Sequence, residues 1–205
     1  MIGRWCRLEP LEARLHADSL FEANTVDADG RMWTYLGYGP FGSRDDYRAW
    51  VELNATAADP LFYAIVDNTT GRATGVAAYL RIDPSNGSIE IGHLAYSPAL
   101  QRTTAATEAM YLLINRVFEL GYRRCEWKCN DLNEPSKAAA RRLGFTFEGV
   151  FRQAMVVKGS NRDTAWFSII DPEWPARRAA FERWLAPDNF DTDGRQRAPL
   201  GRAVS

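Results

Sequence analysis

The chain has 205 residues, and 46% of them are hydrophobic, which is enough to bury one good-sized core. Its 25 basic and 26 acidic residues leave a formal net charge of -1, so no global field favours nucleic acid or an anionic membrane as a partner. No apolar run approaches the roughly 20 residues of a membrane-spanning helix, and the first residues lack the basic-then-apolar order of a signal peptide. We therefore expect a cytoplasmic protein that binds neither nucleic acid nor membrane.

The first half of the chain predicts a strand at residues 5–8 and an amphipathic helix at residues 11–24. The apolar face of this helix is expected at Leu11, Leu15, Leu20 and Phe21. Residues 32–41 are rich in aromatics and glycine, which is typical of a shaped loop. Ser43, three residues before Asp46, is a capping signal for a second helix. That helix should carry Tyr47, Trp50, Val51 and Leu53.

Turn residues at 68–71 and 84–87 then separate three segments with strand patterns. Three consecutive antiparallel strands are predicted at residues 62–66, 74–82 and 88–96. A long helix should follow at residues 103–120. Its buried side is expected at Ala106, Met110, Leu113, Ile114, Val117 and Phe118.

The second half predicts a strand, a helix, a pair of strands and a last helix ending at Trp184. The first four are expected at residues 124–130, 135–143, 145–158 and 163–170. The resulting order, β, α, α, βββ, α, β, α, ββ, indicates an α+β fold. We expect one domain over residues 1–185 and a polar, flexible tail over residues 186–205.

A strand that leads through a turn into a helix at residues 94–110 presents unpaired amide donors and the positive end of the helix dipole. The small side chains of this turn, together with Arg102, suit a pyrophosphate. The alternative is an ordinary capped surface helix, because strand-turn-helix units are common.

Several spaced motifs carry a family resemblance. Gln101 and Ala106 match the first and last positions of the pattern (Gln or Arg)-x-x-Gly-x-(Gly or Ala), with Thr104 where Gly is usual. The further matches are Thr107-Glu108-Ala109, Asn133-x-x-Ser136, Leu143-Gly144-Phe145 and Glu148-Gly149-x-x-Arg152. Over about residues 4–170 the chain resembles the GNAT N-acetyltransferase superfamily, in its branch of ribosomal-protein-alanine-acetyltransferase-like (Rim-type) enzymes. The resemblance implies a GNAT fold, with a central, mixed, mostly antiparallel sheet of about six to seven strands flanked by helices on both faces.

The same resemblance implies acetyl-CoA as co-substrate, held by the turn. The turn residues concerned are Gln101, Arg102, Thr103, Thr104, Ala105 and Ala106. Thr104 either adds a hydroxyl donor or crowds the pyrophosphate, because Gly leaves room for a close ligand. Asn133 would hold the pantetheine arm, although a plain turn role is equally compatible with it. The backbone amide of Leu94 or Ala95 would meet the oxyanion.

For the chemistry, the resemblance offers Glu90 as the base that removes the amine proton. Strand alternation places Glu90, Gly92, Leu94 and Tyr96 on one face and His93 on the other. The alternatives are a solvent-facing Glu90, and His93 as the base rather than a packing residue.

The proton for the departing thiolate needs another donor, because the Tyr that many GNAT enzymes use corresponds to Ala140. Ser136 is the nearest substitute. Its alternative role is to cap the helix that starts near Pro135.

The acceptor pocket of GNAT folds lies around the first two helices, which points to the aromatic loop residues Trp33, Tyr35, Tyr38 and Phe41. Such rings could hold an ammonium group by cation–π contacts. The alternative is that these rings fill the core, which is the favoured reading for Trp127 and Trp166 as possible additions to the pocket. For Tyr35 and Tyr38, which glycines flank in a loop, acceptor binding is the favoured reading. The three cysteines lack zinc spacing, so no metal is expected.

These observations favour an N-acetyltransferase that acetylates a primary amine of a protein N-terminus, a polyamine or a small molecule. The alternative is a catalytically weak or silent acyl-CoA-binding sensor, because Thr104 and Ala140 depart from the family pattern. A nucleotide-binding module would need a Gly-rich phosphate motif that the chain lacks. Family habit also suggests a homodimer.

Overall fold

The computed structural model describes residues 1–201, which form two compact units. The first unit holds residues 1–83 and 89–112, and the second holds residues 84–88 and the described residues from 113 to 201. Helices and strands follow the predicted order, so the α+β class is confirmed. The four residues 202–205 of the expected tail lie outside the described part of the chain.

The first unit is built on four strands in the order β1-β2-β3-β4. Its elements are β1 (Cys6–Pro10), α1 (Ala13–Thr25), a 3-10 turn η1 (Arg31–Trp33), α2 (Arg44–Ala55), β2 (Leu61–Asp67), β3 (Ala73–Asp83), β4 (Ser88–Tyr96) and the first half of α3 (Thr104–Glu119). β1 pairs with β2 and β2 with β3, both antiparallel. The strands predicted at residues 62–66, 74–82 and 88–96 are therefore confirmed as consecutive neighbours β2, β3 and β4 in the sheet, with β2 and β3 antiparallel.

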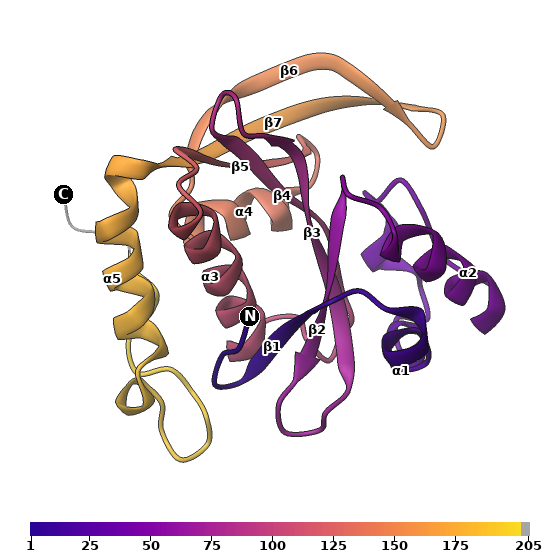
Figure 1. Ribbon diagram of the computed structural model, residues 1–205, viewed down its shortest axis with the longest axis horizontal. Helices are drawn as coiled ribbons and strands as arrows, with labels where there is room; N and C mark the ends of the chain where they lie inside the picture. Colours follow the sequence, from indigo (N-terminus) through magenta and orange to yellow (C-terminus); the bar gives the residue numbers. More distant parts are fainter. Residues whose placement is uncertain (202–205) are drawn as a thin grey trace. The chain divides into compact units, whose positions relative to one another are not determined.

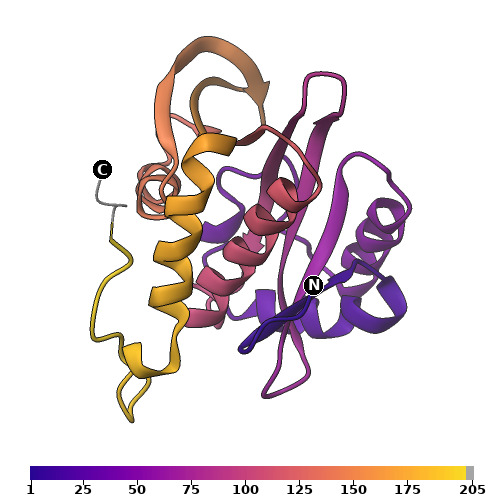
Figure 2. The same cartoon turned by 60° about the vertical axis from the view of Figure 1, so that its left-hand side comes forward.

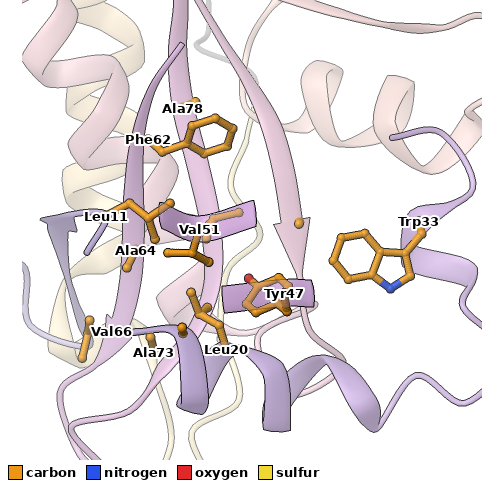
Figure 3. Packing of buried hydrophobic residues seen from close by; sticks show 13 residues of the cluster. Leu11, Leu20, Trp33, Tyr47, Val51, Phe62, Ala64, Val66, Ala73 and Ala78 are labelled. Atoms are coloured by element: carbon orange, nitrogen blue, oxygen red, sulfur yellow. The ribbon is translucent and has the colours of Figure 1, made fainter. Parts of the chain in front are cut away.

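Helices α1 and α2 cover one face of these strands (Figure 1). Ser43 caps α2 as predicted, because its side-chain oxygen accepts the Asp46 N–H at 3.1 Å. The buried side chains of α1 and α2 form a hydrophobic cluster with residues of β2 and β3 that face these helices (Figure 3). The predicted apolar faces were wrong at two positions, since Leu15 is 59% and Leu53 74% exposed. Both lie beyond the stripe of each helix that meets the strands.

The first turns of α3 lie on the opposite face, where the buried carboxylate of Glu108 holds the beginning of the chain. It accepts backbone N–H groups from Arg4 at 2.7 Å, Trp5 at 2.7 Å and Cys6 at 2.9 Å. The Cys6 thiol donates to the Ala105 carbonyl. These bonds fix the start of β1 against the helix that carries the candidate phosphate turn.

The second unit contains three strands in the order β5-β7-β6. Its elements are the second half of α3, β5 (Arg124–Asn130), α4 (Glu134–Arg142), β6 (Thr146–Val157), β7 (Ser160–Ile170), a 3-10 turn η2 (Asp171–Glu173), α5 (Trp174–Leu185) and a 3-10 turn η3 (Pro187–Asn189). β6 and β7 form a long, curved hairpin (Figure 1). α5 runs beside the second half of α3 (Figure 2). Trp174 of α5 stacks on Phe118 of α3.

The described part of the tail makes specific contacts. Gln196 accepts the indole N–H of Trp184 at 2.8 Å, and Asn189 bonds to the backbone of Ala198. Across the described residues, no helix is long and apolar enough to cross a membrane.

Candidate functional site

The turn between β4 and α3 begins with a tight backbone loop. The amides of Leu100 and Gln101 both donate to the carbonyl of Ser97, at 2.9 and 3.0 Å. The Gln101 side chain donates to the Tyr96 carbonyl at 2.8 Å, so it braces the turn. Arg102 then adopts a left-handed backbone (φ 61°) that redirects the chain into the helix.

Thr103 is the residue that caps α3. Its hydroxyl accepts the N–H of Ala106 at 3.1 Å, and its carbonyl accepts the N–H of Thr107. Thr104 opens the helix and is absent from the residues with positive φ, so the Thr in place of Gly causes no backbone strain there.

Three backbone donors of this turn are unused. Within residues 1–201, the N–H groups of Arg102, Thr104 and Ala105 donate to no acceptor. The helix dipole adds positive potential at the same place, and the exposed Arg102 side chain adds a full charge. This arrangement fits a phosphate or pyrophosphate.

Glu90 is buried on β4, only 4% exposed, and its carboxylate pairs with the Arg81 guanidinium at 2.7 Å. The predicted alternative of a solvent-facing Glu90 is therefore wrong. The side chain of Leu80 on β3 lies on the same face of the sheet as Glu90. A Cβ added at Gly92, between them, would meet both Leu80 and the Glu90 carboxylate.

The predicted alternation along β4 fails at His93, whose backbone is left-handed (φ 51°). Its ring stacks on Tyr38 at 5.6 Å and lies 5.1 Å from Phe62. Phe62 pairs with Ala78 on β3, two residues from Leu80, so His93 lies on the Glu90 face rather than the opposite one.

Beyond His93 the alternation of side chains between the two faces of β4 is offset by one residue. Ala95 therefore packs into the hydrophobic cluster on the face that α1 and α2 cover. Tyr96 points the other way, toward Cys6, whose thiol bonds to α3. Burial and this thiol raise the pKa of Tyr96 above its ordinary value. Glu90 and Tyr96 therefore do not share a face. Leu94 and Ala95, the expected oxyanion donors, directly follow the distortion.

The aromatic loop residues pack against one another. Trp33 meets Phe41 at 5.5 Å and Tyr38 at 6.0 Å, and Tyr38 lies 4.6 Å from Trp50. Burial raises the pKa of Tyr38 above its ordinary value. Tyr35 is half-buried on the same loop. Trp33 and Tyr38 thus pack against their aromatic neighbours, and the His93 ring stacks on Tyr38.

A cavity of about 290 Å³ adjoins this cluster and was missed by the sequence analysis. The residues that line it include Trp33, Phe41, Tyr47, Asp27 and Asp29. No sequence pattern marks it, because its walls come from α1, α2 and the loop between them.

Asn133 and Ser136 lie at the start of α4 in the second unit. The Asn133 side chain caps the helix by accepting the Ser136 N–H at 3.1 Å. The capping role considered for Ser136 was therefore wrong. The Ser136 hydroxyl instead accepts the indole N–H of Trp127 at 3.0 Å and interacts with the Cys129 thiol. Trp127 is buried, so its predicted core role is confirmed.

Comparison with known proteins agrees with this geometry. Residues 6–146 match the acetyltransferase (GNAT) domain model. A GCN5-related N-acetyltransferase from Brucella melitensis is similar in structure, with a TM-score of 0.95 and 50% identity over 97% of this chain and 90% of that one. A GNAT-family protein from Chromobacterium violaceum ATCC 12472 gives a TM-score of 0.79 and 46% identity, over 85% of this chain and 87% of that one.

Among curated proteins, YdaF of Bacillus subtilis (strain 168) is 26% identical over 156 residues. The match spans 71% of this chain and 80% of YdaF, a protein named for a suggested ribosomal N-acetyltransferase activity. The chain belongs to the GNAT acetyltransferase family. It is an N-acetyltransferase, and the relationship to YdaF agrees with the expected Rim-type branch.

Proposed function

We propose that the protein is a cytoplasmic enzyme that transfers the acetyl group of acetyl-CoA directly to a primary amine. The observation that supports this most is the start of α3, where three unused backbone N–H groups and Arg102 suit the pyrophosphate of the co-substrate.

In the proposed reaction the neutral amine nitrogen attacks the thioester carbonyl carbon, the C–N bond forms and the C–S bond breaks. The ammonium form of the acceptor first loses a proton, the attacking nitrogen loses a second, and the departing thiolate takes one up. An ammonium and a thioester thus give an amide, a thiol and one proton.

Each proton step has a candidate group on this chain. Glu90 receives the amine proton, with His93 as the second candidate on the same face of β4. The backbone amide of Leu94 or Ala95 stabilises the oxyanion. Ser136 supplies the proton for the thiolate, and Asn133 holds the pantetheine arm.

The acceptor tested first is a peptide N-terminus, because the relative YdaF is named for ribosomal acetylation. Polyamines and aminoglycosides complete the panel, with thiol release from acetyl-CoA as the readout. We expect Glu90→Gln to lower kcat/KM by about 100-fold, the usual size of a general-base contribution. His93→Gln should keep most of the activity, and the reverse result would assign the base to His93.

A silent acyl-CoA-binding sensor is the second candidate, favoured by the ion pair that occupies Glu90 and by buried Ala140 at the usual Tyr position. It predicts heat on titration with acetyl-CoA, no thiol release with any amine, and no effect of Glu90→Gln.

A homodimer is also proposed, with the exposed side chains of Phe151 and Val156 on β6 as part of its surface. Light scattering after gel filtration would test it. A monomer at all concentrations would reject it.

A further inference from the structure

Arg81 has an unusual backbone. Its φ is 49°, a left-handed conformation that is uncommon for residues other than glycine, Asn and Asp. The Asp59 carboxylate holds it there by accepting the N–H groups of Arg81 and Ile82, both at 3.0 Å. Such an outlier persists only where its surroundings stabilise it, and it often marks a functional position.

This backbone conformation brings the Arg81 guanidinium to the Glu90 carboxylate, 2.7 Å away. The two partners differ in exposure: the Arg81 side chain is 51% exposed, whereas that of Glu90 is 5% exposed. The cation is therefore the outer member of the pair, and the carboxylate behind it is shielded from water.

A buried carboxylate that loses its counter-ion becomes strongly destabilised, so it requires a cation. A half-exposed arginine leaves at little cost, because water rehydrates it. A primary ammonium is a compact cation with three N–H donors and satisfies a carboxylate in the same way. His93 lies on the same face, and its partners Tyr38 and Phe62 present ring faces and edges next to it.

We propose that Arg81 is a displaceable counter-ion of Glu90 and that the ammonium group of the acceptor takes its place. The inference rests on the proposed function, because it places the acceptor amine at Glu90. Arg81 is then a specificity-determining residue: only an acceptor whose ammonium head enters beside Glu90 displaces it.

The test measures amine binding without turnover, with n-butylamine hydrochloride as the probe and sodium chloride at equal ionic strength as the blank. A ligand that binds only the folded state raises its Tm. The rise in Tm caused by n-butylamine should therefore be at least about threefold larger in Arg81→Gln than in the wild type. Arg81→Lys should behave like wild type. The added effect should vanish in Arg81→Gln/Glu90→Gln.

Arg72→Gln is the matched control, because Arg72 forms an exposed ion pair with Glu22 in the same unit, away from Glu90. It should leave the amine effect unchanged. If Arg81→Gln does not fold, Asp59→Ala provides a second route, since loss of the backbone clamp should enlarge the amine effect in the same direction.

An equal Tm rise in wild type and Arg81→Gln, or an enlarged rise that persists without the Glu90 carboxylate, would overturn the inference. Failure of the proposed function looks different: the wild type then releases no thiol with any amine, whatever the Tm data show. With an active wild type, Arg81→Gln should lower KM for the amine several-fold and leave KM for acetyl-CoA unchanged.

Discussion

The two units each contain a strand followed by a capped helix start, yet the two starts differ in what they leave unused. At α4 every early donor is used: the Glu134 N–H bonds to the Leu132 carbonyl, Pro135 has none, and the Ser136 N–H bonds to the Asn133 side chain. At α3 the cap satisfies one donor, and three N–H groups of the described turn stay unused. The start of a helix can bind an anion only through backbone N–H groups that have no acceptor within the protein.

The largest expected effect comes from Thr104→Pro, which deletes one of these donors at the first helical position, where proline is well tolerated. We expect acetyl-CoA to bind about 10 to 100 times more weakly, the cost of one hydrogen bond to a charged group. Isothermal titration measures this, and the unfolding free energy should change little. Unchanged affinity would show that the Thr104 N–H does not meet the ligand.

At the start of α4 the group of interest is a side chain, the Ser136 hydroxyl, and not a backbone N–H. Trp127→Phe keeps the ring against Phe145 and removes the N–H that Ser136 accepts. If this bond orients the Ser136 hydroxyl as a proton donor, then Ser136→Ala and Trp127→Phe should each lower kcat about tenfold.

The double variant separates orientation from packing. Residues that act as a unit are non-additive, so Trp127→Phe/Ser136→Ala should lose no more activity than Ser136→Ala alone. A further tenfold loss in the double variant would mean that Trp127 acts independently of Ser136.

The two caps should have equal effects on stability. Thr103→Ala and Asn133→Ala each remove a side-chain acceptor from a helix start, which costs about 1 kcal/mol. Urea unfolding measures both. A loss of unfolding free energy in only one of the two variants would show that the two helices do not depend equally on their caps.

The smallest effect is expected at Arg102, whose side chain is exposed. Arg102→Gln should weaken acetyl-CoA binding about threefold at low salt and less at high salt, because exposed charges are screened. A salt-independent loss would point to a structural role instead.

Much of this comparison could be predicted from the sequence. Periodicity gave the order of strands and helices, and spaced motifs gave the turn before α3 and the residues Asn133 and Ser136. Which of the latter two caps the helix could not be predicted, because Asn and Ser are both good caps and only the backbone geometry selects one.

Strand alternation was the weakest guide. It assumes a regular period of two, and the left-handed backbone that breaks this period falls on His93, a residue type that does not predict such a conformation. The Arg81–Glu90 pair was missed for a similar reason. It depends on Asp59, 22 residues from Arg81 in the chain, and no local pattern links them.

Hydrogen-exchange mass spectrometry of the wild type, with and without acetyl-CoA, tests the central claim most directly. Amides already bonded exchange slowly, whereas unused ones slow only when a ligand accepts them. Acetyl-CoA should therefore slow exchange at residues 102–105, and the residues that start α4 should change much less. Unchanged exchange at residues 102–105 with saturating acetyl-CoA would contradict the account.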